Sequence, residues 1–277
     1  MRTATATGGL RKLATGVSHY TTAGRVARFL PRKLAYEARV HTRRPGRNEF
    51  AAHTATLDRD GVVVIPDFID QPTLARMRQA LPDISAFRYS VEGEKSFFLP
   101  DAHTITELAP FFESPLVRAI ARRYVSPAAV PLRRTIGIKN ITGELASFEV
   151  FHHMDTWKRR MKAFLYIDDV GPAQAPLRYV KRSHHGLWRL PMEATISAMY
   201  RVDNDGFARP EDLYVGCFWP HEVQRLSEAY GLEETTCTGP GGTLVIFDGR
   251  GLHRATPLVE GSRTNLMSYW IHPGDHT

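Results

Sequence analysis

Two histidines, an aspartate and an arginine, widely separated along the chain, constrain its fold more than any other feature. His153 and Asp155 stand two residues apart, His253 follows a hundred residues later, and Arg263 follows ten residues after that. Residues i and i+2 of an extended segment point to one face, so His153 and Asp155 can reach one ion together. His253 and Arg263 can join them only in a fold that brings strands remote in sequence side by side.

The chemistry of these four residues indicates a metal centre. Two imidazoles and one carboxylate leave open positions on a metal, and this is the ligand set of non-haem Fe(II) oxygenases. We therefore predict that His153, Asp155 and His253 bind Fe(II) and form the catalytic centre. A guanidinium holds a carboxylate at two points, so we predict that Arg263 binds 2-oxoglutarate, the cosubstrate used with O2. For His153 and Asp155 taken alone, a hydrogen-bonded structural pair is the alternative.

The segments around these residues are typical of strands. Residues 163–167 are apolar, and residues 241–248 combine a glycine pair, which indicates a turn, with a β-branched run. Adjacent strand residues face opposite sides, so His152 should point away from the ion that His153 binds. We expect strands at 132–140, 146–152, 163–167, 243–248 and 264–271, and helices that begin at Asp70-Gln-Pro72 and Ser114-Pro115.

Several segments also carry a resemblance to a known family. They are Asp60–Phe68, Phe151–Asp155, Leu165–Val170, Pro176–Val180, Ser183–Gly186 and Gly241–Phe247, followed by His253 and Arg263. In this order they resemble the phytanoyl-CoA dioxygenase-like family of Fe(II)/2-oxoglutarate-dependent oxygenases. The resemblance spans about residues 55 to 272, which is most of the chain.

The resemblance implies a mainly β fold with flanking helices around a double-stranded β-helix, the jelly-roll or cupin-like core. It also implies Fe(II) at His153, Asp155 and His253, 2-oxoglutarate at Arg263, and a small organic molecule as substrate. Related halogenases lack the carboxylate at the position of Asp155. We therefore expect an oxygenase that hydroxylates or otherwise oxidises its substrate while 2-oxoglutarate is decarboxylated to succinate.

Two parts of the chain depart from the family's pattern, a loop and the residue two positions after the distal histidine. Lys181 and Arg182 stand where the family commonly has a proline and a glycine, and Ala255 stands where a serine or threonine often supports the oxoglutarate carboxylate. Thr256 is a candidate substitute for that hydroxyl. Lys139 is a lesser candidate for contacting 2-oxoglutarate, and a solvated cation at a strand end is the alternative for it.

Length and composition fit one domain around such a core. At 277 residues, with 43% hydrophobic and 23% charged residues, the chain can bury a substantial interior. We expect the domain over residues 48–277, with a lid-like insertion at about 186–231. No apolar run approaches the ~18 residues needed to cross a bilayer. Cys217 and Cys237 lack metal-site spacing, so we interpret them as reduced or buried thiols.

The net charge of +7 is unevenly distributed. Residues 1–47, a basic leader, carry 11 Lys or Arg and one acid, Glu37, which leaves 25 basic and 28 acidic residues in the remainder. This distribution argues against a nucleic-acid-binding body. The leader fits a transit peptide, although Pro31 should interrupt the amphipathic helix of such a segment. The alternatives are a cationic arm for a membrane or an acidic partner, and a partly disordered tail with a surface helix of no specific role. We expect a cytoplasmic protein, or a mitochondrial matrix protein if the leader is a transit peptide.

Two other functions remain open. A jelly-roll can be a non-catalytic module that binds a ligand, and the same three ligands can hold zinc in a hydrolase. Arg263 favours the oxygenase, because a hydrolase needs no buried anchor for a carboxylate. Ser183 and His184 lack the G-x-S-x-G elbow of a nucleophile, so we interpret His184 as a residue that orders its loop.

Overall fold

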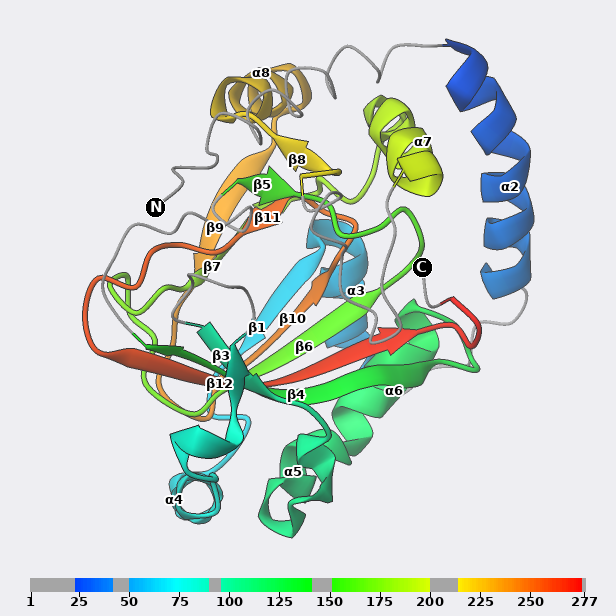
Figure 1. The fold of residues 1–277 in the computed structure, drawn as a ribbon. Coiled ribbons are helices and arrows are strands. Elements are labelled where there is room, and N and C mark those ends of the chain that lie inside the picture. The colour runs from blue at the N-terminus through cyan, green and yellow to red at the C-terminus, as the bar shows by residue number, and fades with distance from the viewer. Residues whose placement is uncertain (1–22, 42–49, 90–95, 141–150, 200–213, 276–277) are drawn as a thin grey trace, which may run out of the picture.

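Two facing antiparallel sheets form the centre of the molecule (Figure 1). The computed structural model describes residues 23–41, 50–89, 96–140, 151–199 and 214–275. The larger sheet has the order β1 (Val62–Ile65), β10 (Leu244–Asp248), β6 (Met161–Tyr166), β12 (Ser262–Ile271), β4 (Val130–Asn140), β3 (Ser96–Leu99), β2 (Arg88–Tyr89). The smaller has the order β8 (Cys217–Phe218), β5 (His152–His153), β11 (His253–Arg254), β7 (Leu177–Lys181), β9 (Glu233–Cys237).

This arrangement confirms the predicted jelly-roll core. Strands far apart in the chain alternate within each sheet, as β10, β6 and β12 do, so each central strand lies between partners remote in sequence. The predicted strands at 132–140, 163–167, 243–248 and 264–271 correspond to β4, β6, β10 and β12, with small differences at their ends. Residues 146–150 lie outside the described residues, and β9 is a strand that we did not predict.

Helices cover the outer face of the larger sheet. They are α3 (Ala51–Asp60), α4 (Gln71–Gln79), α5 (Ala109–Phe112) and α6 (Pro115–Tyr124). The two predicted helix starts are confirmed: the side chain of Asp70 accepts from Thr73 N at 2.8 Å, and that of Ser114 accepts from Val117 N at 3.3 Å. Short 3-10 turns lie at η1 (Ile84–Ala86), η2 (Ala102–Thr104), η3 (Thr106–Leu108) and η5 (Leu187–Arg189).

Alternation along β6 divides its residues between two environments. Ala163 and Leu165 are fully buried in the core beneath the helices, a cluster that also contains Leu57, Met77, Ile120, Ile246 and Leu266. Phe164 and Tyr166 instead join a second cluster with Val62, Val170, Leu177, Tyr179, Cys237, Val245 and Phe247. Because this cluster contains residues of both sheets, it fills part of the space between them.

The N-terminal helix α2 (Ala23–His41) runs along one side of the molecule beside α7 (Leu190–Met199) (Figure 1). Our expectation that Pro31 interrupts this helix was wrong, because the helix continues through it. Tertiary packing on both sides of the proline compensates for the lost backbone hydrogen bond. The Phe29 and Tyr36 rings pack edge-on against Trp157 at centroid distances of 5.1 and 5.2 Å.

Ion pairs join α2 to the rest of the chain. Lys33 binds the buried carboxylate of Glu193 on α7, and Arg39 binds Asp275 at 2.7 Å. The only acid of the leader, Glu37, lies 3.5 Å from Arg159. Residues 23–41 therefore pack against the domain, while residues 1–22 and 42–47 of the leader lie outside the described residues.

The insertion at 186–231 contains η5, α7, β8 and α8 (Pro220–Tyr230), and residues 200–213 lie outside the described residues. Its strand β8 extends the smaller sheet by pairing with β5. Both cysteines are buried thiols, as predicted, and burial raises the pKa of each to about 12. None of the described helices combines the length and apolar character needed to span a membrane.

Candidate metal centre

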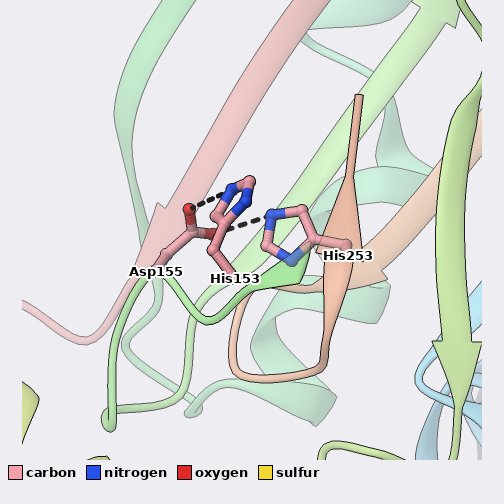
Figure 2. Close-up of side chains that lie close together, drawn as sticks. All are labelled: His153, Asp155 and His253. Atoms are coloured by element: carbon pink, nitrogen blue, oxygen red, sulfur yellow. Dashed lines mark ion pairs between the residues drawn. The ribbon is translucent and has the colours of Figure 1, made fainter. Parts of the chain in front are cut away.

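His153 on β5, His253 on β11 and Asp155, two residues after the end of β5, converge on one point (Figure 2). His153 on β5 pairs directly with His253 on β11, which places the two imidazoles side by side with ring centroids 4.4 Å apart. His153 Nε2 lies 3.8 Å from Asp155 Oδ1, and His253 Nε2 lies 3.4 Å from Asp155 Oδ2. One ligand atom from each residue lies within 4.8 Å of the others, a spacing that one metal ion can bridge.

The hydrogen bonds of the two histidines leave the ligand nitrogens free of protons. His153 Nδ1 lies 2.9 Å from Phe151 O, and His253 Nδ1 lies 2.9 Å from Gly251 O. A carbonyl only accepts, so Nδ1 carries the hydrogen in each ring and Nε2 presents a lone pair. Burial lowers the pKa of His153 to about 3, which keeps that ring neutral.

This donor set fits a metal ion. The lone pair of His253 Nε2 faces a carboxylate oxygen at 3.4 Å, and the nitrogen is buried without a hydrogen-bond partner in the described structure. Two acceptors that face each other repel unless a cation lies between them. The facial set of two imidazoles and one carboxylate suits Fe(II) in particular, because it leaves positions for other ligands.

A glycine makes room for the carboxylate. Asp155 N donates to Gly249 O at 2.9 Å, which ties the ligand to the chain just after β10. A Cβ added at Gly249 would lie 2.5 Å from Asp155 Oδ2. We did not single out Gly249 from the sequence, although its position directly after the strand that leads to His253 was a usable signal.

A buried lysine contacts the same carboxylate. Lys162 Nζ on β6 lies 2.9 Å from Asp155 Oδ2 and 4.7 Å from the centroid of the Tyr269 ring. Burial alone would raise the pKa of Asp155, but the positive charge of Lys162 holds it well below its usual range. Burial alone would lower the pKa of Lys162, but Asp155 raises it. Both groups are therefore charged, and we did not predict this pair from the sequence.

Aromatic rings support His253 from the space between the sheets. The Phe247 ring centroid lies 5.1 Å from that of His253, and the Tyr179 ring stacks on it at 6.3 Å and 18°. Tyr179 OH donates to Asp248 O at 3.1 Å, and a Cβ on Gly251 would lie only 1.9 Å from that hydroxyl. Because Gly251 has no side chain, the Tyr179 ring can lie against the His253 ring.

A carboxylate on β9 joins the strands behind the ligands. Glu234 accepts from His152 Nε2 at 2.6 Å, from Arg178 Nη1 at 3.2 Å and from Arg254 Nε at 3.1 Å. His152 therefore turns away from the metal ligands, as predicted. Because His152 and Arg254 each adjoin a ligand histidine, Glu234 connects β5 to β11 on the face opposite the candidate site.

Arg263 is the second residue of β12 and is buried. Its Nη1 donates to Ala175 O. When the Asn265 side-chain amide is turned so that both its oxygen and its nitrogen form hydrogen bonds, Arg263 Nε donates to Asn265 Oδ1 at 3.2 Å. Thr256 Oγ1 donates to Pro176 O at 2.8 Å, so Thr256 and Arg263 bind neighbouring carbonyls of one loop. The backbone of Lys139 pairs with Arg263, but the Lys139 side chain lies outside the described residues.

Ser183 and His184 order the loop that precedes the second histidine. Ser183 Oγ accepts from Leu252 N at 2.7 Å and donates to Val180 O at 2.5 Å. His184 Nε2 donates to Asp58 O at 3.1 Å, and burial lowers the pKa of His184 to about 3. These contacts agree with the structural interpretation of His184.

Comparison with known proteins gives the fold a context. No family model matches the chain, and no curated protein does. Among solved structures, the epimerase SnoN, with Fe3+, alpha ketoglutarate and nogalamycin RO, covers 80% of this chain and 83% of its own at 16% identity and TM-score 0.58. The chain therefore shares the fold of SnoN.

Two further solved structures are similar to the chain over most of their length. The alpha ketoglutarate dependent carbocyclase SnoK covers 82% of this chain and 87% of its own at 16% identity and TM-score 0.54. EctD from S. alaskensis, with 2-oxoglutarate and 5-hydroxyectoine, covers 82% and 78% at 17% identity and TM-score 0.54. The neighbours share the fold, but no match identifies the phytanoyl-CoA dioxygenase-like family itself.

Proposed function

We propose that this protein is an Fe(II)/2-oxoglutarate-dependent oxygenase that oxidises a small organic molecule. The observation that carries the proposal is the convergence of His153, Asp155 and His253, with both Nε2 lone pairs directed at the carboxylate. Three protein ligands on one side leave the other side of a metal for a keto acid and O2. When bound, Fe(II) would supply the redox chemistry that couples decarboxylation of 2-oxoglutarate to oxidation of the substrate.

The residues of the chain then have separate roles. The two histidines and Asp155 hold the metal, and the carbonyls of Phe151 and Gly251 keep each imidazole in the ligating tautomer. Arg263 is the proposed anchor for the far carboxylate of 2-oxoglutarate, since its fork can meet that group at two points. Burial of the guanidinium strengthens such a pairing by excluding water.

The neighbours support this class and leave the outcome of the oxidation broad. SnoN is an epimerase, SnoK a carbocyclase, and EctD was solved with 5-hydroxyectoine. SnoN and EctD were solved with alpha ketoglutarate or 2-oxoglutarate, and SnoK is alpha ketoglutarate dependent. With Asp155 present as a third ligand, we propose hydroxylation, or a related hydrogen-removing oxidation, of a small-molecule substrate.

Succinate release tests the proposal. The purified chain is incubated with Fe(II), 2-oxoglutarate and ascorbate across a panel of small molecules, and succinate and substrate mass are measured. We expect succinate from the wild type and none from Asp155→Ala, with a gain of one oxygen in a turned-over substrate. A folded, metal-loaded wild type that forms no succinate across the panel would contradict the proposal and favour a binding module. Zn(II)-supported hydrolysis without 2-oxoglutarate would instead indicate a hydrolase.

A further inference from the structure

Lys162 is a buried cation at a position where its neighbours on the same strand face are aromatic. It occupies β6 two residues before Phe164 and four before Tyr166, which join the cluster between the sheets. The whole residue is 9% exposed. A buried ammonium is costly unless a specific partner stabilises it, so this position demands an explanation.

The surroundings of the ammonium direct it at one acceptor. Rings of Tyr269 and Phe247 lie 4.7 and 5.7 Å from Nζ and stabilise the charge through their faces. The one carboxylate oxygen paired with Nζ among the described residues is Asp155 Oδ2, at 2.9 Å. The ammonium therefore has a fixed position on the rings and a single anionic contact, which is a proposed metal ligand.

Other constraints on Asp155 act on its backbone or limit its space. The Asp155 amide is held by Gly249 O, and the absence of a side chain at Gly249 leaves room for Oδ2. These constraints do not set the rotation of the carboxylate about its own bonds. Lys162 does so, because it holds Oδ2 while Oδ1 lies on the side of His153 Nε2.

We propose that Lys162 is a positioning residue that orients the Asp155 carboxylate for metal binding. The inference rests on the proposed metal site and goes beyond it. Lys162 is not a proposed ligand, yet it would hold the Asp155 carboxylate, the charged member of the ligand set, in the orientation that binds the metal. Hydrogen bonds from outside the ligand set commonly determine metal affinity in this way, and their loss lowers affinity by about 10- to 100-fold.

Lys158 provides a matched control on the same segment. It is also a partly buried lysine, its Nζ lies 5.6 Å from the centroid of the Trp157 ring, and it pairs with an acid, Asp275, at 3.6 Å. Asp275 is not a proposed ligand. Lys158→Met therefore removes a comparable cation and ion pair without touching Asp155.

The test is a titration of the full-length apo protein with Co(II), followed by calorimetry and visible absorption. We expect Lys162→Met to raise the Kd for Co(II) by about 10- to 100-fold and to alter the visible bands at saturation. Lys158→Met should match the wild type in both. Lys162→Arg should recover part of the lost affinity, because it restores a cationic donor. Thermal unfolding of each apo protein checks the fold, and Lys162→Gln replaces Lys162→Met should the latter not fold.

Two outcomes overturn the inference, and a third concerns the site itself. Co(II) binding by the neutral Lys162 variant that equals the wild type would show that the carboxylate needs no such support. Tighter binding would show that the ammonium competes with the metal for Asp155. Failure of the folded wild type to bind Co(II) would instead contradict the metal site, and with it both proposals.

Discussion

Two buried aspartates, Asp155 and Asp248, differ in how the chain satisfies them. Asp248 accepts from Arg250 Nε and Nη2 at 2.9 and 2.6 Å, from the Arg250 amide at 2.8 Å and from Tyr124 OH at 2.5 Å. Asp155 meets one ammonium and two imidazole nitrogens that carry lone pairs. The chain completes the bonding of Asp248, whereas Asp155 needs an external cation to complete its own.

The surroundings of Asp248 are those of a structural ion pair. Burial alone would raise the pKa of Asp248, but Arg250 holds it well below its usual range. The guanidinium of Arg250 also lies 3.8 Å from Glu37 on α2, so this pair takes part in attaching the N-terminal helix. Asp248 is the last residue of β10, and Asp155 binds the backbone of the next residue, Gly249, so two neighbouring carboxylates differ in their partners: one has a structural ion pair, and the other is the proposed metal ligand.

The largest expected effect is on metal binding. Asp155→Ala should abolish measurable Fe(II) or Co(II) affinity, because the two histidines lose the only anionic ligand between them. Asp248→Ala should leave a binding site in whatever fraction stays folded. Calorimetric titration with Co(II) checks both variants. Metal binding by Asp155→Ala as tight as that of the wild type would remove the distinction between the two aspartates.

The second expected effect is on the free energy of unfolding, and here the Asp248 variant should lose more than the Asp155 variant. Asp248→Ala leaves Arg250 buried without its carboxylate, and breaking such a pair costs about 3 to 5 kcal/mol. Asp155→Ala leaves Lys162 without its acid, but also removes a carboxylate that faces two lone pairs, so we expect a smaller loss. Urea unfolding of the metal-free proteins measures both. A larger loss of unfolding free energy in Asp155→Ala would contradict this assignment of roles.

The sequence predicts the parts of this picture that depend on periodicity and on residue type. An apolar run identified β6, a β-branched run after a glycine pair identified β10, and two-residue spacing identified the pair of His153 and Asp155. Strand β9 escaped notice because its residues, Glu-Glu-Thr-Thr-Cys, are mostly exposed at the edge of a sheet and show no apolar alternation. The contact of Lys162 with Asp155 depends on the path of the intervening loop, which no local pattern encodes.

The docking of α2 was hidden for a related reason. A proline and a run of arginines are typical of a solvated segment, and only tertiary contacts reveal which side chains turn inward. Phe29, Tyr36 and the single acid Glu37 do so here, against Trp157 and Arg159. Local propensity gave way to packing, as it commonly does in helices whose stability comes from one buried face.

The third prediction extends the comparison to the arginines. Arg250 has a carboxylate of the chain as its partner, whereas Arg263 donates to the carbonyl of Ala175 and is proposed to bind a carboxylate from outside. Arg263→Ala should leave Co(II) affinity unchanged and raise the 2-oxoglutarate concentration needed for half-maximal succinate release by roughly 10- to 100-fold, as expected for a charged hydrogen-bonded pair. Arg263→Lys should be intermediate, since it retains the charge without the fork. If Arg263→Ala needs no more 2-oxoglutarate than the wild type, another residue must bind the far carboxylate of 2-oxoglutarate.

The smallest effect concerns Glu234, which pairs with Arg178, Arg254 and His152, more nitrogen-bearing partners than the single Arg250 of Asp248, but is only half-buried. Burial alone would raise its pKa, but hydrogen bonds from His152 and Arg254 lower it to about 2. Since the folded pKa lies below the unfolded value, the stabilisation is complete above about pH 4.5 and is lost as pH falls toward 2. Partial exposure limits it to about 1 kcal/mol or less.

Replacing the carboxylate tests this contribution. Glu234→Gln should flatten the fall in unfolding free energy between about pH 4.5 and 2, measured by urea unfolding at several pH values. Its neighbour Glu233, whose side chain is 74% exposed and lies 3.7 Å from Lys181, is the matched control, and Glu233→Gln should keep the wild-type slope. Equal slopes in wild type and Glu234→Gln would show that solvent has already replaced these contacts. In that case burial, more than the number of partners, would separate Asp248 from the acids at the surface.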